Sequence, residues 1–310
     1  MGINTTYGST SGAEIREDVL DVIYQITPED TPFFNMIGDS DANSPVHQWT
    51  TRDISTRQDN AVQEGASFTF EQIQTASRVS NLTQIFRKLP RVPRSRQSST
   101  HVGISALMAD QIQQSAVGLK TDVEHALLRG SQVSGTSNDS TARRLGGFDD
   151  VITNNLVADY NGSAGTLTES LFNDLLEEIW NDGGRAQDVL VGSKLKRTIS
   201  SFTASSTKFF MQDDRRVVNT IGVYESDFHV TNIHLSRDMR NTAGTGGDAG
   251  QDVFAFDRSF FAKAWLDRPI VERLPKIADA QDALIIAECT LEYGNENAAG
   301  KISQLGTIST

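Results

Sequence analysis

A single cysteine, few aromatic residues and no long hydrophobic run set the first limits on this chain of 310 residues. Cys289 has no second cysteine to pair with, which excludes an intrachain disulfide framework and fits a reducing compartment. No run of about 18 apolar residues occurs, so we expect no membrane-spanning helix. Residues 1–4 have neither the basic start nor the apolar stretch of a secretory signal. These absences exclude disulfide-rich secreted proteins and helical membrane proteins.

Motifs of catalysis and ligand binding are also missing. The five histidines form no HExxH or other metal-ligand spacing, and no G-x-S-x-G nucleophile elbow occurs. The glycine-rich stretch 244–250 is not the G-x-G-x-x-G of a dinucleotide site. Cys289 alternates with polar neighbours on a predicted strand, where a buried, inert thiol is the usual outcome. We therefore predict no catalytic residue, no metal and no cofactor, and a protein that is not an enzyme.

Acidic residues are absent from one long stretch, although they outnumber basic residues 40 to 28 in the whole chain. Residues 72–109 contain no Asp or Glu but carry six cations. This stretch could dock on acidic surface, for example of a neighbouring identical chain, bind nucleic acid, or be a strand edge protected by charges. Phe86 is its only ring, whereas single-strand binders stack bases on several aromatic side chains. Docking is the favoured interpretation.

The residues that are present predict a mixed chain of helices and strands. Apolar residues at steps of three and four predict a helix over 11–26 and a long helix over 104–129 that ends at Gly130. Alternating residues at 46–52 and 77–88 predict a two-stranded ribbon. Such a ribbon is marginal in isolation and needs another surface to lie on.

Beyond residue 147 the pattern changes to alternating helices and strands. Thr166 with Glu169 predicts a helix start, and a helix should follow up to the glycines at 183–184. A buried strand is expected at 188–191, a helix beginning at Ser193 comes next, and further strands are expected at 216–224, 228–235, 253–256 and 287–293. Residues 294–310 are small and polar, which predicts an arm.

Seven short sequence features, taken in their order along the chain, indicate a resemblance to a known family. They are the Asp-Thr-Pro-Phe at 30–33, the helix ending Ala-Leu-Leu-Arg-Gly at 126–130, the Gly-Gly-Phe at 146–148, Trp180 with the glycines at 183–184, the Val-Leu-Val-Gly-Ser at 189–193, the Tyr-Glu-Ser-Asp-Phe at 224–228 and the Thr-Leu-Glu-Tyr at 290–293. Their order over about 280 residues resembles the major capsid proteins of tailed bacteriophages, whose fold is shared with encapsulins.

The resemblance implies an α+β fold divided into regions. Its expected parts are an N-terminal arm, an extended β-hairpin loop, a peripheral domain around a long spine helix, an α/β axial domain and a C-terminal arm. Their expected bounds are, in that order, 1–46, 47–87, 88–147 with 266–293, 148–265, and 294–310. In such proteins the extended loop lies across a neighbouring subunit, which would supply the surface that the ribbon needs.

Exposed rings and cations of the arm, the loop and the basic stretch are the expected inter-subunit contacts. The alternative for each ring is packing within its own chain. These candidates are Phe33, Phe34, Trp49, Arg52, Arg57, Phe68, Phe70, Arg87, Lys88, Arg91, Arg94 and Arg96. No lysine lies between Val46 and Arg87, so a covalent Lys–Asn cross-link from the extended loop, used by some relatives, is not available.

The resemblance implies a major capsid protein that self-assembles through hexamers and pentamers into an icosahedral head enclosing double-stranded DNA. DNA would be held without sequence-specific binding, and no membrane would be involved. Scaffolding, decoration and portal proteins would be separate partners. Assembly would take place in the host cytoplasm, and the product would be part of the virion. The alternatives are an encapsulin-type compartment and a cytosolic α/β enzyme with an unrecognised site.

Overall fold

The fold is described from a computed structural model of the chain. It describes residues 30–52, 59–67, 75–99, 106–135, 141–159, 165–202, 222–242, 250–276 and 278–305. The helix expected over 11–26 lies outside these residues. Within them, no helix is long and apolar enough to cross a membrane.

Helices and strands alternate along the described chain. The helices are α1 (Pro32–Met36), α2 (Arg94–Ser98), α3 (Leu107–Arg129), α4 (Phe148–Val151), α5 (Glu169–Asn181) and α6 (Ser193–Phe202), with short 3-10 turns η2 (Arg258–Phe260) and η3 (Glu296–Ala298). The strands are β1 (Gly38–Asp41), β2 (Val46–Thr51), β3 (Ser77–Leu82), β4 (Gln84–Lys88), β5 (Arg91–Pro93), β6 (Leu156–Asp159), β7 (Asp188–Val191), β8 (Val223–Glu225), β9 (Val230–Leu235), β10 (Asn241–Thr242), β11 (Gly250–Phe256), β12 (Phe261–Arg273), β13 (Ala280–Tyr293) and β14 (Ala299–Leu305).

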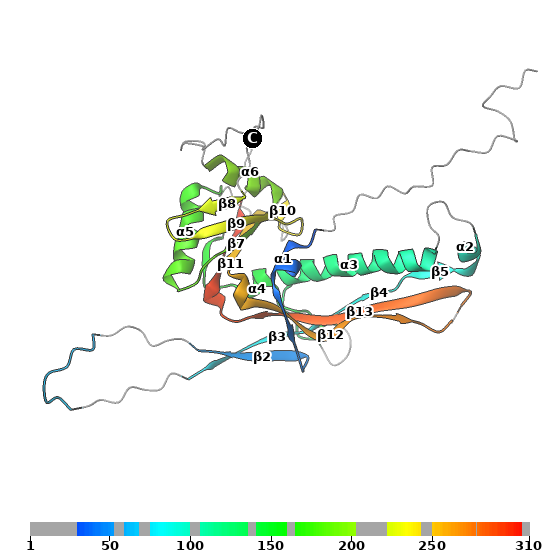
Figure 1. Cartoon of the computed structure of the whole chain (residues 1–310), viewed down its shortest axis with the longest axis horizontal. Coiled ribbons are helices and arrows are strands. Elements are labelled where there is room, and N and C mark those ends of the chain that lie inside the picture. Colours follow the sequence, from blue (N-terminus) through cyan, green and yellow to red (C-terminus); the bar gives the residue numbers. More distant parts are fainter. Residues whose placement is uncertain are drawn as a thin grey trace, which may run out of the picture.

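Two sheets and a separate ribbon organise these strands (Figure 1). A five-stranded sheet has the order β1-β12-β13-β4, with β5 also paired to β13. A seven-stranded sheet has the order β6-β14-β11-β7-β9-β8, with β10 paired to β11. The third unit is the antiparallel pair β2–β3. We call these units the peripheral sheet, the axial sheet and the ribbon.

The spine helix α3 lies along the peripheral sheet (Figure 1). Its apolar residues recur every three or four positions, so Leu119, Val123 and Leu127 share the face that packs on the sheet. The helix ends where the N–H of Gly130 donates to the carbonyl of Ala126 at 2.8 Å. The sequence prediction of a long helix that ends at Gly130 is confirmed, with its start at Leu107.

Helices α5 and α6 contribute to the apolar core on one face of the axial sheet. The Thr168 hydroxyl accepts a hydrogen bond from the backbone N–H of Leu171 at 3.2 Å and caps α5. The expected cap, Thr166, lies two residues too early. Past the C-terminal end of α5, Gly183 has φ of +87°, a conformation that favours glycine.

A cluster of phenylalanines joins the two sheets. Phe33 packs edge-on against Phe148, Phe256 and Phe261, with ring centroids 5.3–6.4 Å apart. Phe33, Phe148 and Phe256 are fully buried. Residues from the start of the described chain, from α4 and from both sheets therefore form one continuous core.

Two expected boundaries are wrong. The predicted C-terminal arm, 294–310, contains β14, which lies between β11 and β6 inside the axial sheet. The predicted N-terminal arm, 1–46, contains α1 and β1, which belong to the core and to the peripheral sheet. The composition of residues 294–310, which are small and polar, predicts an arm, although in β14 such residues are buried. The bounds 1–46 come from the resemblance alone.

Candidate subunit-contact surfaces

The ribbon extends away from the two sheets (Figure 1). Its strands pair from Val46 opposite Leu82 to Thr51 opposite Ser77. Residues 59–67, farther along the ribbon, are all exposed and include a turn in which Gly65 has φ of +83°. A segment with no buried side chain gains no stability from its own core. The predicted two-stranded ribbon is confirmed for residues 46–51 and 77–82, whereas residues 84–88, expected in its second strand, form β4 of the peripheral sheet.

Trp49 lies at the base of the ribbon and packs within its own chain. Its ring is perpendicular to that of Tyr293, with centroids 5.0 Å apart. Beside it, His47 Nε2 lies 3.2 Å from a carboxylate oxygen of Glu292. These contacts attach the ribbon to β13 and leave Trp49 half-buried. The side chain therefore has an internal role whether or not a neighbour also contacts it.

Phe33 is fully buried, so its ring is not available to a neighbouring subunit. The prediction of Phe33 as an inter-subunit contact is corrected on this point. Phe34 is half-buried: its ring lies 6.2 Å from that of Trp265, and Lys263 Nζ lies 4.5 Å from its centroid. The Asp-Thr-Pro-Phe turn is covered by its own chain because α3, α4 and both sheets converge on it.

Three cations of the basic stretch pair with carboxylates of the same chain. Lys88 Nζ lies 2.5 Å from Asp122 Oδ2 on the spine helix. Arg91 Nε lies 3.1 Å from Asp282 Oδ1. Arg94 Nε lies 3.3 Å from Asp279 Oδ1. No local pattern predicts these pairs, because each partner is distant in the sequence and is brought close by sheet pairing or by helix packing.

The remaining candidates fall into two groups. Arg52, Arg87 and Arg96 are exposed, and neither Arg52 nor Arg87 forms an ion pair with a described carboxylate. Arg57, Phe68 and Phe70 lie outside the described residues. The basic stretch therefore runs from β3 of the ribbon through β4 and β5 on the peripheral sheet to α2.

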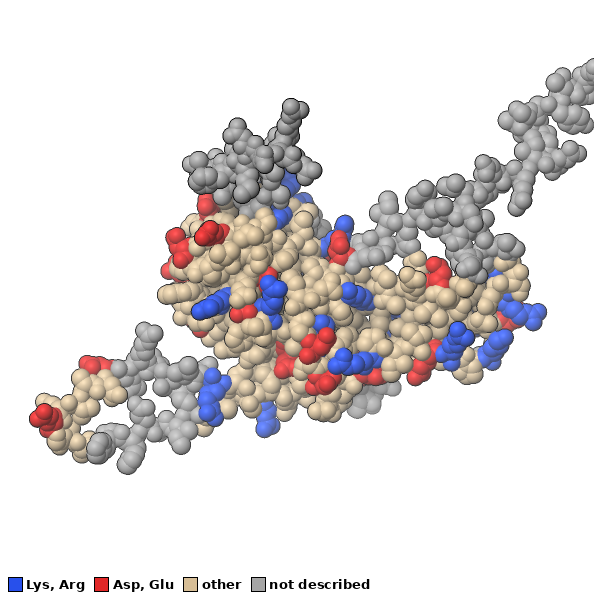
Figure 2. All heavy atoms as spheres, viewed as in Figure 1, with Lys and Arg blue, Asp and Glu red and all other residues tan. Residues whose placement is uncertain are grey.

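Acidic side chains lie on the described distal part of the ribbon, whereas basic and acidic side chains are mixed at the other end of the molecule (Figure 2). Asp59 and Glu64 are exposed on the part of the ribbon that lies farthest from the sheets. At the other end, exposed cations of β5 and α2 lie beside Arg273 at the end of β12. These cations are in part offset by Asp279 and Asp282.

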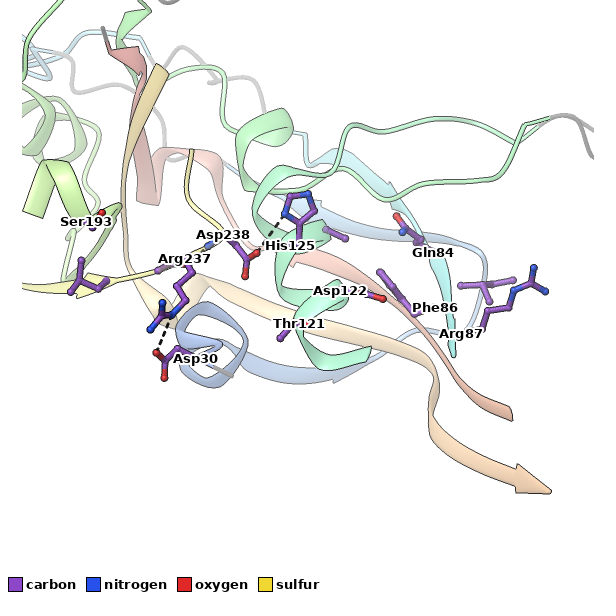
Figure 3. A pocket seen from close by; sticks show the side chains of 14 residues that line it. Asp30, Gln84, Phe86, Arg87, Thr121, Asp122, His125, Ser193, Arg237 and Asp238 are labelled. Atoms are coloured by element: carbon purple, nitrogen blue, oxygen red, sulfur yellow. Dashed lines mark hydrogen bonds and ion pairs between the residues drawn. The ribbon is translucent and has the colours of Figure 1, made fainter. Parts of the chain in front are cut away.

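An open cavity of about 1160 Å³ lies between the spine helix, β4 and the segment after β9 (Figure 3). His125 Nδ1 lies 3.6 Å from Asp238 Oδ1, and Arg237 Nε lies 3.6 Å from Asp30 Oδ2. These contacts link the spine helix and the start of the described chain to the axial part.

Two other residues of types that can act in catalysis, Cys289 and Asp188, have structural roles. Burial raises the pKa of the Cys289 thiol to about 12, which leaves it protonated and unreactive. The buried Asp188 accepts from His234 Nε2 at 2.9 Å and pairs with Arg258 Nε at 2.8 Å. In the part of the chain that the structure describes, no group of three or more His, Cys, Asp or Glu side chains is placed to hold a metal.

The chain is similar to phage proteins both in sequence and in structure. The major capsid protein of Escherichia phage Phieco32 is 30% identical over 106 residues, a match that spans 34% of this chain and 30% of that protein. The structure of a capsid chain from an empty GTA particle aligns with a TM-score of 0.64 and 12% identity, and the alignment covers 99% of this chain and 100% of that one. A chain from Mycobacterium phage Ogopogo aligns with a TM-score of 0.62 and 13% identity, over 93% and 96% of the two chains.

The structural likeness confirms the expected α+β capsid fold. Because the sequence identity to these structures is only 12–13%, the likeness is evidence for the fold and for nothing more. The family model described as SU10 major capsid protein matches residues 2–306, nearly the whole chain. The named relatives are structural proteins, which confirms that the chain is not an enzyme. Because the match spans both sheets, the ribbon and the spine helix, the chain belongs to the SU10 major capsid protein family.

Proposed function

We propose that this major capsid protein assembles, through hexamers and pentamers of itself, into the closed icosahedral head of a tailed phage. The head would form in the host cytoplasm and enclose double-stranded DNA. The ribbon carries the proposal, because residues 59–67 bury no side chain in the chain that contains them. A neighbouring copy is the surface that would order and stabilise this segment.

Each contact in such a shell is weak, and closure makes the assembly stable. A two-stranded ribbon is marginal alone, and surface ion pairs contribute about 0–1 kcal/mol each. Every subunit in a closed shell makes several such contacts at once, so their contributions combine through effective concentration. The absence of lysine between Val46 and Arg87 leaves noncovalent contacts, or separate decoration proteins, to stabilise the shell.

Acidic side chains on the distal ribbon and exposed cations at the other end of the molecule support a head-to-tail contact between copies. Asp59 and Glu64 of the ribbon would approach the exposed cations of the peripheral end of a neighbour. Charge complementarity of this kind selects the partner and orients it more than it adds affinity. Arg87 and Arg96 are exposed cations of the basic stretch that we propose for subunit contact, and Arg52 is an exposed cation of the ribbon itself.

The proposed relation to DNA is containment without specific contact. The chain carries a formal net charge of −12, whereas phosphate binding requires cationic surface. We propose that scaffolding, decoration and portal functions belong to separate proteins of the same head.

Expression of the full chain together with its flanking genes, followed by negative-stain electron microscopy, tests the proposal. Closed, hollow shells of uniform size are the expected result. A stable 33.9-kDa monomer under all conditions of expression would contradict it.

A further inference from the structure

Helix α5 presents an exposed aromatic residue on the surface of the axial part. The Trp180 side chain is 54% exposed at the C-terminal end of the helix. Its ring centroid lies 6.0 Å from that of the half-buried Phe228, in the turn before β9. Trp180 therefore rests on an aromatic support and exposes the rest of its surface. Tryptophan is the residue type that most often contributes strongly to protein–protein binding.

The helix that carries this tryptophan is acidic. Helix α5 contains four acidic residues and no basic one. Glu177 is exposed and lies one turn before Trp180, so both side chains are on the same side of the helix. Glu177 forms no ion pair within the described residues. We call Glu177 and Trp180, with Phe228 behind them, the α5 face.

Helix α6 has the opposite character. It contains Lys194, Lys196 and Arg197 and no acidic residue. Lys194 and Arg197 are exposed, whereas Lys196 Nζ donates to the carbonyl of Ile233 at 3.0 Å and attaches the helix to β9.

An exposed leucine lies beside this basic helix. Leu235 is 53% exposed and lines the same cavity as Ser193, the first residue of α6. We call Lys194, Arg197 and Leu235 the α6 face. Each of the two faces thus combines an exposed apolar side chain with charge of one sign, and the signs are opposite.

We propose that the α5 face of one subunit packs against the α6 face of the next subunit around each hexamer and pentamer. Trp180 would cover Leu235, and Glu177 would pair with Lys194 or Arg197. Figure 1 shows α5 along one flank of the axial part and α6 at another, so the two faces are separate surfaces of one subunit. A contact between two different surfaces of identical chains generates rings when the rotation closes. This inference rests on the proposed shell and names a contact within it.

Charge reversal with rescue tests the pairing. Glu177→Lys should reduce the yield of capsomers and shells at least about tenfold, because the repulsion recurs at every contact of a ring. Combining Lys194→Glu and Arg197→Glu should reduce the yield similarly. A chain carrying all three substitutions should recover to within about threefold of the wild type, since the opposite charges are restored with exchanged positions.

Glu178→Lys is the matched control. It makes the same charge change on the same helix, but residue 178 is rotated about 160° from Trp180 at 100° per residue. Its shell yield should match that of the wild type. The reduction caused by Glu177→Lys should be smaller in high salt, because salt screens exposed charges.

Cysteine cross-linking gives an independent readout. The chain has one cysteine, and Cys289 is fully buried, so engineered thiols have no exposed native competitor. Shells of a chain carrying both Glu177→Cys and Lys194→Cys, treated with a short bis-maleimide, should give a ladder of covalent oligomers. Glu178→Cys with Lys194→Cys should give none.

The outcomes separate the inference from the function on which it rests. Normal yields from Glu177→Lys, or no rescue by the triple substitution together with no ladder, would overturn the α5–α6 contact while shells still form. Failure of the wild-type chain to form shells would overturn the proposed function and this contact with it.

Discussion

Glu124 shows how one buried side chain fixes the start of the described chain to the spine helix. Its carboxylate oxygens accept the backbone N–H groups of Phe33, at 3.0 Å, and of Phe34, at 2.6 Å. The pKa of this carboxyl is raised to about 7, mainly by burial and also by nearby Asp238, while the two N–H groups and Lys120 act in the opposite direction. A carboxyl in this position is partly protonated near neutral pH.

The raised pKa of Glu124 makes the stability of the fold depend on pH. The folded chain retains a proton that the unfolded chain releases above about pH 4.5, so this stabilisation is complete below pH 4.5 and is lost as the pH rises through about 7. Glu124→Gln is neutral throughout. The free energy of unfolding of the wild type, relative to Glu124→Gln, should fall by about 3 kcal/mol between pH 4.5 and pH 8. Urea denaturation of unassembled chains measures this, and a constant difference would refute the assignment.

Gly147 occupies a position where no side chain fits. A Cβ atom there would lie 2.5 Å from the carbonyl oxygen of Ala126 and 2.6 Å from the backbone nitrogen of Gly130. Gly147→Ala should therefore lower the free energy of unfolding by about 1–3 kcal/mol, because the end of the spine helix must shift. Gly222→Ala is the control, since nothing lies within 4 Å of its Cβ position and the change should stay within about 0.5 kcal/mol. Equal stability of both variants in urea denaturation would contradict this account.

At the scale of elements, the sequence predicts the helices and strands whose buried residues recur at regular spacing along the chain. The spine helix was predictable because Leu119, Val123 and Leu127 recur at helical spacing on one face. The buried strand β7 was predictable because its apolar residues are consecutive. The α5 cap was misplaced by two residues because Thr166 and Thr168 are both suitable cap residues, and only the backbone conformation distinguishes them.

The sequence does not predict strand β14 because its buried lysine is satisfied by a distant partner. Lys301 is buried, and its ammonium group donates to the carbonyl and the carboxylate of Asp149. Asp149 also pairs with Arg240, whose guanidinium reaches the buried Asp252. A lysine in a short polar segment indicates solvent exposure when read alone. Phe33 is the opposite case, because three elements that are distant in the sequence cover an apparently exposed ring.

The distal part of the ribbon, beyond β2 and β3, is the segment whose removal should separate folding from assembly. Replacing residues 53–75 with Asn-Gly would join the two strands by a two-residue turn. The free energy of unfolding should change by less than about 1 kcal/mol, since the exposed segment 59–67 contributes no buried side chain. Shells should be absent in electron micrographs, whereas urea denaturation should remain that of the intact fold. Normal shells from this variant would remove the basis of the proposed function.

At the scale of the whole molecule, the phenylalanine cluster joins the two sheets into one body. Exposed charged side chains at the ends of this body are available for contact with neighbouring subunits. A cation that forms an ion pair within its own chain is a poor test of a subunit contact, because its substitution also disturbs the fold. Arg91→Glu and Arg94→Glu would each place a carboxylate against Asp282 or Asp279 and so disturb the peripheral end as well. Arg87 forms no ion pair with a described carboxylate and is the better choice.

Arg87→Glu should therefore act on assembly alone. The substitution is on an exposed position, so the free energy of unfolding should change by less than about 0.5 kcal/mol. The yield of shells, measured by sedimentation, should fall and should recover partly as salt is raised. Arg87→Gln should give an intermediate yield. Unchanged assembly of Arg87→Glu would exclude this cation from subunit contacts.

A cryo-electron microscopy map of shells formed by the wild-type chain tests the central claim most directly. The account predicts that the ribbon, β2 and β3 with residues 59–67, lies on the surface of an adjacent subunit in every position of the shell. A ribbon folded back onto its own chain, with no contact to a neighbour, would contradict it.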